Sequence, residues 1–350
     1  MKKYLVLEDG TTYCGTAFGA ETEAVGELAF STGMSGYQEL ISDPASNGLI
    51  LNFTAPIIGN SGINKKFNEA DKLVAHGVVV NQLADAIGNY QSEMSLEAYL
   101  KAEGVPGITG IDTRSVMLKL REQGTMRAAL VNQPDTHWSD KIKNFRLDKE
   151  QLSKSWGDAV RVFEGEGKHL VLLDCGVGHS LVRVFNKEGF RISVVPHTYT
   201  LDQIKALEPD AIVLSDGPGT PTTYTPLLEV IKALQKAYPL LGIGLGHQLL
   251  CMANGAQVEP LKAGHHGFNY SVKDLRTHRN FFTAQNFRYV VAEGSLKNTD
   301  LELTHVGLHD NTVQGVQHTK YKAFSFQFHP EATPGPHDAH FLIDEFTALI

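Results

Sequence analysis

The stretch Leu240-Leu-Gly-Ile-Gly-Leu-Gly-His-Gln-Leu-Leu250 decides the fold of the C-terminal half of the chain. Pro239 ends the preceding helix, Leu240 to Ile243 predict a short buried strand, and Leu245 to Ala253 predict a helix that begins after a sharp turn. Hydrolases use such a turn to present a nucleophile beside free backbone N–H groups. The residue at the tip of this turn is Gly244, which has no side chain to present.

The same glycines are compatible with a second interpretation, a phosphate-binding loop of a dinucleotide fold. That fingerprint requires a third glycine where this chain has His247, and an acidic residue about twenty positions further on, near Lys262. The spacing therefore disfavours dinucleotide binding.

The composition is that of an ordinary globular chain: 350 residues, of which 42% are hydrophobic and 20% charged, enough for two domains. The net charge of -8 is spread without long runs, which disfavours nucleic acid and anionic membranes as partners. We expect no signal peptide and no membrane span. Because Cys14, Cys175 and Cys251 form no C-x-x-C pair, we expect no disulfide framework, no metal site and a cytoplasmic location.

A polar stretch near residues 145–167 predicts a domain boundary, with domains over 1–150 and 168–350 and a linker over 151–167. The second domain alternates strands and helices, which predicts a doubly wound α/β sheet with ligands at the carboxyl ends of its strands. The expected elements are a strand His169–Asp174, a helix His179–Glu188, a strand Arg191–Pro196, a helix capped by Thr200, a strand Ala211–Leu214, a helix capped by Thr225 with Pro226 first, and a last helix Ala339–Ile350.

The first domain has a different pattern, with short strands broken by Gly, Pro and Asn. Two helical patterns, Met94–Glu103 and Asp112–Gln123, are interspersed, which predicts a smaller mixed α+β domain. The expected strands include Tyr4–Leu7, Leu28–Phe30, Leu49–Phe53 and Gly77–Val80.

One further pair of residues has the chemistry of a catalytic site. His329 and Glu331 are two positions apart in an extended segment, so their side chains share a face and the carboxylate can orient the imidazole. Such a pair is by itself more often part of a hydrogen-bonded loop, but after a nucleophile turn it favours catalysis.

Three motifs together resemble the class I glutamine amidotransferases, which use Cys, His and Glu to release ammonia from glutamine: Leu214-Ser-Asp-Gly-Pro-Gly219, Gly242-Ile-Gly-Leu-Gly-His-Gln248 and Phe326-Gln-Phe-His-Pro-Glu331. Further stretches resemble the small subunit of carbamoyl-phosphate synthase, and the resemblance extends over the whole chain. The stretches that resemble this small subunit are Leu7-Glu-Asp-Gly10, Met34-Ser-Gly-Tyr-Gln-Glu39, Ile58-Gly-Asn60, Ile111-Asp-Thr-Arg114, Gly264-His-His-Gly267 and Pro334-Gly-Pro-His-Asp338.

The resemblance implies a role for each matching position. The residue at 244 would be the attacking cysteine, His329 its general base, and Glu331 the group that orients the histidine. Backbone groups at Gly219 and Leu245 would face the oxyanion. Glutamine would be held by Ala45, Gly217, Gln248, Asn286, Arg288 and Tyr289. Ammonia would pass to a large subunit that uses ATP, Mg and bicarbonate, whereas this chain itself would need no cofactor or metal.

The chain departs from the family pattern at several glutamine-facing places. Besides Gly244, it has Ala45 where the family has serine, and Phe287 and Arg288 where a small, open loop is expected. Cys251 lies about 10 Å further along the helix and cannot replace the nucleophile. Because several places have changed together, natural loss of glutaminase activity is favoured over a single laboratory substitution. Two functions stay open: a working glutaminase subunit, and a catalytically silent scaffold that activates an ammonia-using synthetase.

Overall fold

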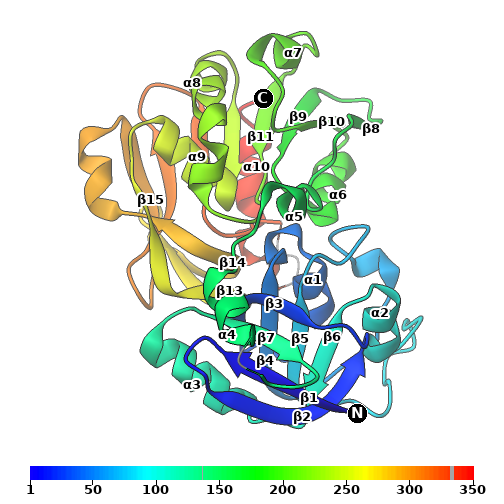
Figure 1. The fold of residues 1–350 in the computed structure, drawn as a ribbon. Helices are drawn as coiled ribbons and strands as arrows, with labels where there is room; N and C mark the ends of the chain where they lie inside the picture. Colours follow the sequence, from blue (N-terminus) through cyan, green and yellow to red (C-terminus); the bar gives the residue numbers. More distant parts are fainter. Residues whose placement is uncertain (136, 332–334) are drawn as a thin grey trace. The chain divides into compact units, whose positions relative to one another are not determined.

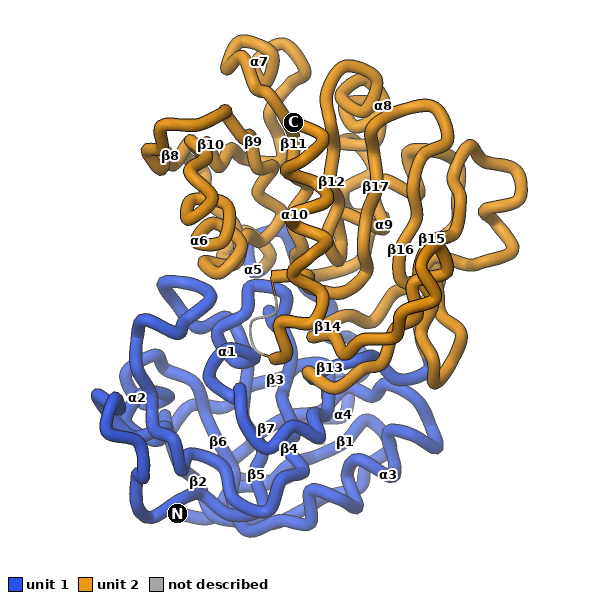
Figure 2. The backbone as a smooth tube through the Cα atoms, turned by 180° about the vertical axis from the view of Figure 1, so that it is seen from behind, with its two compact units in different colours: residues 1–151, 262–267 blue, residues 152–261, 268–350 orange. Residues whose placement is uncertain are grey.

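The computed structural model describes residues 1–135, 137–331 and 335–350, so Pro334 in the last of the quoted motifs lies outside the described residues. The chain forms two compact units (Figure 2). The first unit contains residues 1–151 and 262–267, and the second contains residues 152–261 and 268–350. Two expected boundaries are corrected: residues 152–167 belong to the second unit instead of a linker, and residues 262–267 belong to the first.

The first unit is a closed barrel with the strand order β1-β2-β6-β5-β4-β3-β7 (Figure 1). The strands are β1 Lys2–Leu7, β2 Thr12–Gly19, β3 Ala24–Ser31, β4 Leu49–Ile58, β5 Gly77–Leu83, β6 Pro106–Thr109 and β7 Met126–Val131. In β1, Leu5 and Leu7 alternate with less buried residues and pack inside the barrel with Ile108 and Leu130. The strand pattern predicted parts of β1, β3, β4 and β5, but neither β2, β6 and β7 nor the closure into a barrel.

Two helices of the first unit, α2 and α3, begin at side-chain caps. Ser95 accepts a hydrogen bond from the Ala98 N–H at the start of α2, Leu96–Ala102. Asp112 accepts one from the Ser115 N–H at the start of α3, Thr113–Gln123, which confirms the predicted helix there. The other helices are α1 Tyr37–Ser42, α4 His137–Asn144, and α5 Lys149–Ser153, which crosses the boundary between the units.

The second unit is built on a sheet of ten strands in the order β14-β13-β15-β16-β17-β12-β11-β9-β10-β8. Strands β10, β9, β11, β12 and β17 are parallel neighbours, and antiparallel strands extend the sheet on both sides. The strands are β8 Arg161–Phe163, β9 His169–Asp174, β10 Arg191–Pro196, β11 Ala211–Leu214, β12 Leu240–Ile243, β13 Val258–Asp274, β14 Asn280–Val291, β15 Leu301–Gly307, β16 Val313–His318 and β17 Ala323–Phe326.

Both faces of the parallel sheet are covered, as in a doubly wound fold. Within β9, Leu170 and Leu172 pack in one hydrophobic cluster, while Val171 and Leu173 pack in another. The first cluster includes residues of α6 and α10, and the second includes residues of α8 and α9. The helices are α6 His179–Lys187, α7 Leu201–Lys205, α8 Leu228–Ala237, α9 Leu245–Ala253 and α10 Phe341–Thr347.

Two predicted helix starts are wrong. Thr225 does not cap a helix, because Pro221–Leu227 form a 3-10 helix that includes Pro226, and α8 begins after it. The last helix begins at Phe341 instead of Ala339, because His337–Ala339 form a 3-10 helix before it. The predicted capping box at Thr200 is confirmed.

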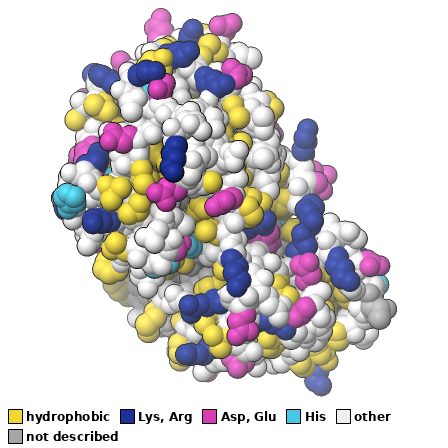
Figure 3. Space-filling model, turned by 90° about the vertical axis from the view of Figure 1, so that its left-hand side faces the viewer, with side chains coloured by type: hydrophobic (Ala, Val, Ile, Leu, Met, Phe, Trp, Pro, Cys, Tyr) yellow, Lys and Arg dark blue, Asp and Glu magenta, His cyan; other side chains and the backbone are white. Residues whose placement is uncertain are grey.

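On the face of the molecule in Figure 3, Lys and Arg side chains are interspersed with Asp and Glu. Within the described residues, no helix has both the length and the apolar character needed to cross a bilayer.

Candidate functional site

The centre of the candidate site is the turn between β12 and α9. Gly244 has φ +56° and ψ -112°, a backbone conformation that is strained for residues with a Cβ and easily adopted by glycine. Its N–H donates to the Phe326 carbonyl at 2.9 Å, which fixes the turn against β17. The turn that presents a nucleophile is therefore formed, although residue 244 offers no reactive atom.

A second glycine brings the start of α9 against the end of β11. A Cβ on Gly246 would lie 2.3 Å from the Leu214 carbonyl oxygen, so no larger residue fits. The Gly246 N–H donates to the Ser215 carbonyl at 3.0 Å. This close approach places Asp216, the next residue after Ser215, beside Gly244.

The Asp216 carboxylate fills the space next to Gly244. A Cβ built on Gly244 would lie 2.2 Å from the Asp216 Cγ, far inside any allowed contact. The Asp216 Oδ1 accepts hydrogen bonds from the Leu245 N–H at 2.7 Å and the Gly217 N–H at 2.8 Å. Leu245 is the first residue of α9, where the helix dipole favours a negative charge. The expected oxyanion donor at Leu245 is thus already occupied by a side chain.

His329 lies between two carboxylates. Its Nδ1 is 2.9 Å from the Glu331 Oε1, and its Nε2 is 3.0 Å from the Asp216 Oδ2. The contact with Asp216 is a close ion pair whose N–H does not point along the N···O line, and neither of its two atoms has a hydrogen-bond partner among the described residues. All three side chains are buried, with 4 to 12% of each exposed.

This arrangement determines the protonation state of His329. Burial by itself lowers the pKa of His329, but the charge of Glu331 and the contact with Asp216 outweigh burial and raise the pKa well above its usual value. The two carboxylates therefore favour the protonated imidazolium, in which neither ring nitrogen has a lone pair for accepting a proton. This form of His329 does not fit the general-base role that the sequence led us to expect.

Residues expected to hold glutamine at the far side of the turn make contacts with one another. The Gln248 amide donates to the Tyr289 carbonyl at 2.7 Å and to the Gln327 Oε1 at 3.2 Å. Arg288, which is half-buried, lies over the Tyr289 ring and donates to its hydroxyl at 2.9 Å. Asn286 and Phe287 are buried in the same strand, β14. The structure thus brings α9 and β14 together. Strand β14 also contacts His329, because the His329 N–H donates to the carbonyl of Ala284 in β14.

The remaining predicted positions are backbone sites or lie in the first unit. Gly217 is held tightly, since a Cβ there would lie 2.0 Å from the Cys175 carbonyl oxygen, and Gly219 has φ +86°. Ala45 is in the 3-10 helix Pro44–Ser46 of the first unit, where its N–H donates to Asp43 at 2.9 Å.

Cys251 does not take part in the site. Its side chain is completely buried in the hydrophobic cluster beneath α9, and burial raises the pKa of its thiol. It is a core residue, as the sequence indicated.

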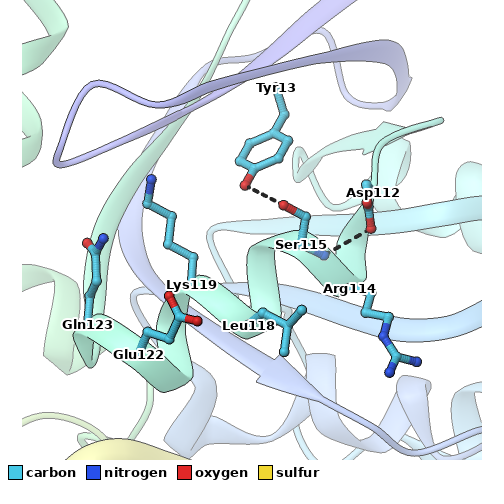
Figure 4. A pocket seen from close by; sticks show the side chains of 8 residues that line it. All are labelled: Tyr13, Asp112, Arg114, Ser115, Leu118, Lys119, Glu122 and Gln123. Carbon is cyan, nitrogen blue, oxygen red and sulfur yellow. Dashed lines mark hydrogen bonds between the residues drawn. The ribbon is translucent and has the colours of Figure 1, made fainter.

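The first unit has a separate hollow of about 390 Å³ beside α3 (Figure 4). The Tyr13 hydroxyl contacts the Ser115 hydroxyl there at 3.2 Å. The hollow is lined by Tyr13, Asp112, Arg114, Ser115, Leu118, Lys119, Glu122 and Gln123.

The comparisons with known proteins agree with the motifs. Residues 5–130 match the family model described as carbamoyl-phosphate synthase small chain, CPSase domain, and residues 171–349 match glutamine amidotransferase class-I. The chain belongs to the carbamoyl-phosphate synthase small-chain family. This small chain is 46% identical over 352 residues to the carbamoyl phosphate synthase pyrimidine-specific small chain of Lactiplantibacillus plantarum, with 100% of this chain and 96% of the relative covered.

A second relative and a solved structure are also similar to this chain. The carbamoyl phosphate synthase small chain of Oceanobacillus iheyensis is 43% identical over 351 residues, covering 100% of this chain and 96% of the relative. The crystal structure of a glutamine amidotransferase from Thermotoga maritima matches with a TM-score of 0.38 and 19% identity, covering 52% of this chain and 83% of that chain. The family is the glutamine-hydrolysing part of the synthase, and membership implies a large-subunit partner for this small chain.

Sequence reasoning missed Asp216, although this residue is in one of the quoted motifs. The available signal was its position: it follows β11, and the carboxyl end of β11 adjoins the carboxyl end of β12, where the nucleophile turn begins. The distance between Asp216 and Gly244 could not be obtained from the spacing alone.

Proposed function

We propose that this small chain has lost glutaminase activity and acts as a scaffold for a large subunit that makes carbamoyl phosphate from ammonia. The observation that carries the proposal is that Gly244 has no side chain and that the Asp216 carboxylate fills the space beside it. Without a nucleophile at residue 244, no glutamyl-enzyme intermediate can form there.

Direct attack by water is a poor substitute. Deleting the nucleophile of a comparable triad costs on the order of a millionfold in turnover. A water molecule would also need a base, and His329 is already protonated between Asp216 and Glu331. Any remaining glutaminase activity is expected to be negligible.

The expected glutamine pocket supports the same proposal. Ala45 has no hydroxyl to offer a substrate, and the Gln248 amide is committed to Tyr289 and Gln327. Arg288 is held against Tyr289. We therefore propose that glutamine is bound weakly or in no productive orientation.

The partner would perform the remaining chemistry. In this proposal the large subunit binds ATP, Mg and bicarbonate, and this chain needs no cofactor of its own. A relative is named as the pyrimidine-specific small chain. We extend that role to this chain, with arginine biosynthesis as the alternative pathway and the cytoplasm as the location.

The test is reconstitution with the large subunit. Carbamoyl phosphate formation is measured with glutamine or with an ammonium salt as the nitrogen source. We expect ammonium to support synthesis and glutamine to support at most about one thousandth of that rate. Comparable rates from the two sources would instead establish a working glutaminase.

A control separates true activity from a contaminating glutaminase. Residual glutamine-dependent synthesis is measured again with His329→Ala, which removes the imidazole of the proposed site. A residual rate that is unchanged in this variant comes from a contaminant, and one that falls comes from the small chain.

A further inference from the structure

The place that the missing nucleophile would occupy is filled. The Asp216 Cγ lies where a Cβ on residue 244 would have to be, at a separation of only 2.2 Å. The same carboxylate accepts the Leu245 N–H, the donor that would otherwise stabilise an oxyanion. It also lies 3.0 Å from the His329 Nε2, on the ring nitrogen that faces away from Glu331. One side chain thus occupies three places that the glutaminase reaction requires.

We propose that the Asp216 carboxylate closes the emptied site. It takes the space of the nucleophile's side chain, accepts the Leu245 N–H that would bind the oxyanion, and pairs with His329. This inference rests on the proposed loss of glutaminase activity and names the residue that enforces it. Loss of the nucleophile and closure by Asp216 are then two separate barriers, and repairing the first does not remove the second.

The carboxylate is held firmly enough to resist displacement. Asp216 is buried, with 7% of its surface exposed, and its Oδ1 accepts two backbone hydrogen bonds. Hydrogen bonds to a charged group are stronger than those between neutral groups. Rotating the side chain away would break these bonds and leave His329 without its ion pair. A thiol introduced at residue 244 would therefore meet both the volume and the negative charge of Asp216.

A reactivity measurement tests the closure directly. Gly244→Cys is introduced in a Cys14→Ser background, with the large subunit present, because Cys14 is the exposed cysteine of the chain. Burial raises the pKa of the Cys175 and Cys251 thiols, which keeps them unreactive. The rate of labelling by iodoacetamide is then compared between Gly244→Cys alone and Gly244→Cys combined with Asp216→Ala.

We expect removal of the Asp216 carboxylate to accelerate labelling by about ten-fold or more, since it opens the space and lowers the thiol pKa. Asp216→Asn is the matched variant, because it keeps the size and removes the charge, and we expect an intermediate rate. Equal labelling rates with and without Asp216 would overturn the proposal.

A second measurement needs no change at residue 244. The pKa of His329 is followed by NMR in the chain with Gly244 unchanged and in the same chain with Asp216→Asn, and we expect the substitution to lower the pKa by about one unit. An unchanged pKa would show that Asp216 does not pair with His329, and this too would overturn the proposal. Neither measurement depends on glutamine turnover, so glutaminase activity in the native chain would refute the proposed function separately.

Discussion

At the scale of single residues, Gly244 forms the sharp turn between β12 and α9 without supplying a nucleophile. Gly244 keeps φ +56°, and the neighbouring Gly246 keeps the close approach to Leu214. The sequence predicted this turn because three glycines between a buried strand and an apolar helix leave few alternatives. It did not predict the role of Asp216, because a rotamer that fills a neighbour's space depends on packing between distant segments.

Gly244→Ala should destabilise the second unit by more than the usual cost of a Cβ at positive φ. Strained backbone costs about 1–3 kcal/mol, and the collision with Asp216 adds to it. Gly255→Ala is the matched control, because Gly255 has φ +93° and nothing within 4 Å of its Cβ position. Urea unfolding is followed by Trp156 fluorescence in a Trp138→Phe background. If Gly244→Ala and Gly255→Ala lose equal amounts of unfolding free energy, the Asp216 side chain moves aside at no cost.

At the scale of elements, strands and helices were predicted best where the pattern is local. The strands β10, β11 and β12 have the predicted bounds, because parallel strands buried on both faces are continuous apolar runs. The barrel of the first unit was not predicted, because closure of β1 onto β7 depends on the pairing of strands that are far apart in sequence. The start of α8 was wrong because Pro221 and Pro226 both lie in a preceding 3-10 helix.

A charge cluster around the buried Asp274 joins the end of β13 to helix α10 and gives a pH-dependent stability. Arg276 binds both Asp274 and Glu345 at 3.0 Å. Burial opposes the ionised form of Asp274, but hydrogen bonds from Arg276 outweigh burial and lower the pKa of Asp274 to about 2. A depressed carboxyl pKa contributes stability above the unfolded value near 4, and that contribution is lost as the pH falls toward 2.

Asp274→Asn should therefore lower the free energy of unfolding at pH 7 by roughly 2 kcal/mol. The difference between the native chain and the variant should shrink between pH 4 and pH 2. Urea unfolding at a series of pH values measures both effects. A difference that stays constant over this range would contradict the assigned pKa.

At the scale of the whole molecule, the two units share the chain more intimately than the sequence indicated. The backbone passes between them at residues 151/152, 261/262 and 267/268, three times in all. Residues 262–267 belong to β13 yet group with the first unit, where the Lys262 carbonyl accepts the Thr125 N–H at 2.7 Å. A linear boundary drawn from composition cannot predict such an exchange, because it assigns each domain one continuous stretch of sequence.

This shared strand should couple the unfolding of the two units. When the second unit unfolds, residues 262–267 lose the strand that holds them in place, so the first unit loses part of its structure as well. Trp138 reports on the first unit and Trp156 on the second. We expect Trp138→Phe and Trp156→Phe to unfold with the same urea midpoint. Two well-separated midpoints would show that the units unfold independently.

The side chains around Gly244 also determine how the site responds to oxidants. A low-pKa thiolate is oxidised through sulfenic to sulfonic acid, and enzymes that depend on one lose activity under peroxide. The site around Gly244 contains a carboxylate, an imidazolium and a second carboxylate, none of which follows that sequence of oxidations. Under the proposed function, the small chain would therefore bring no oxidisable nucleophile to carbamoyl phosphate synthesis at this site.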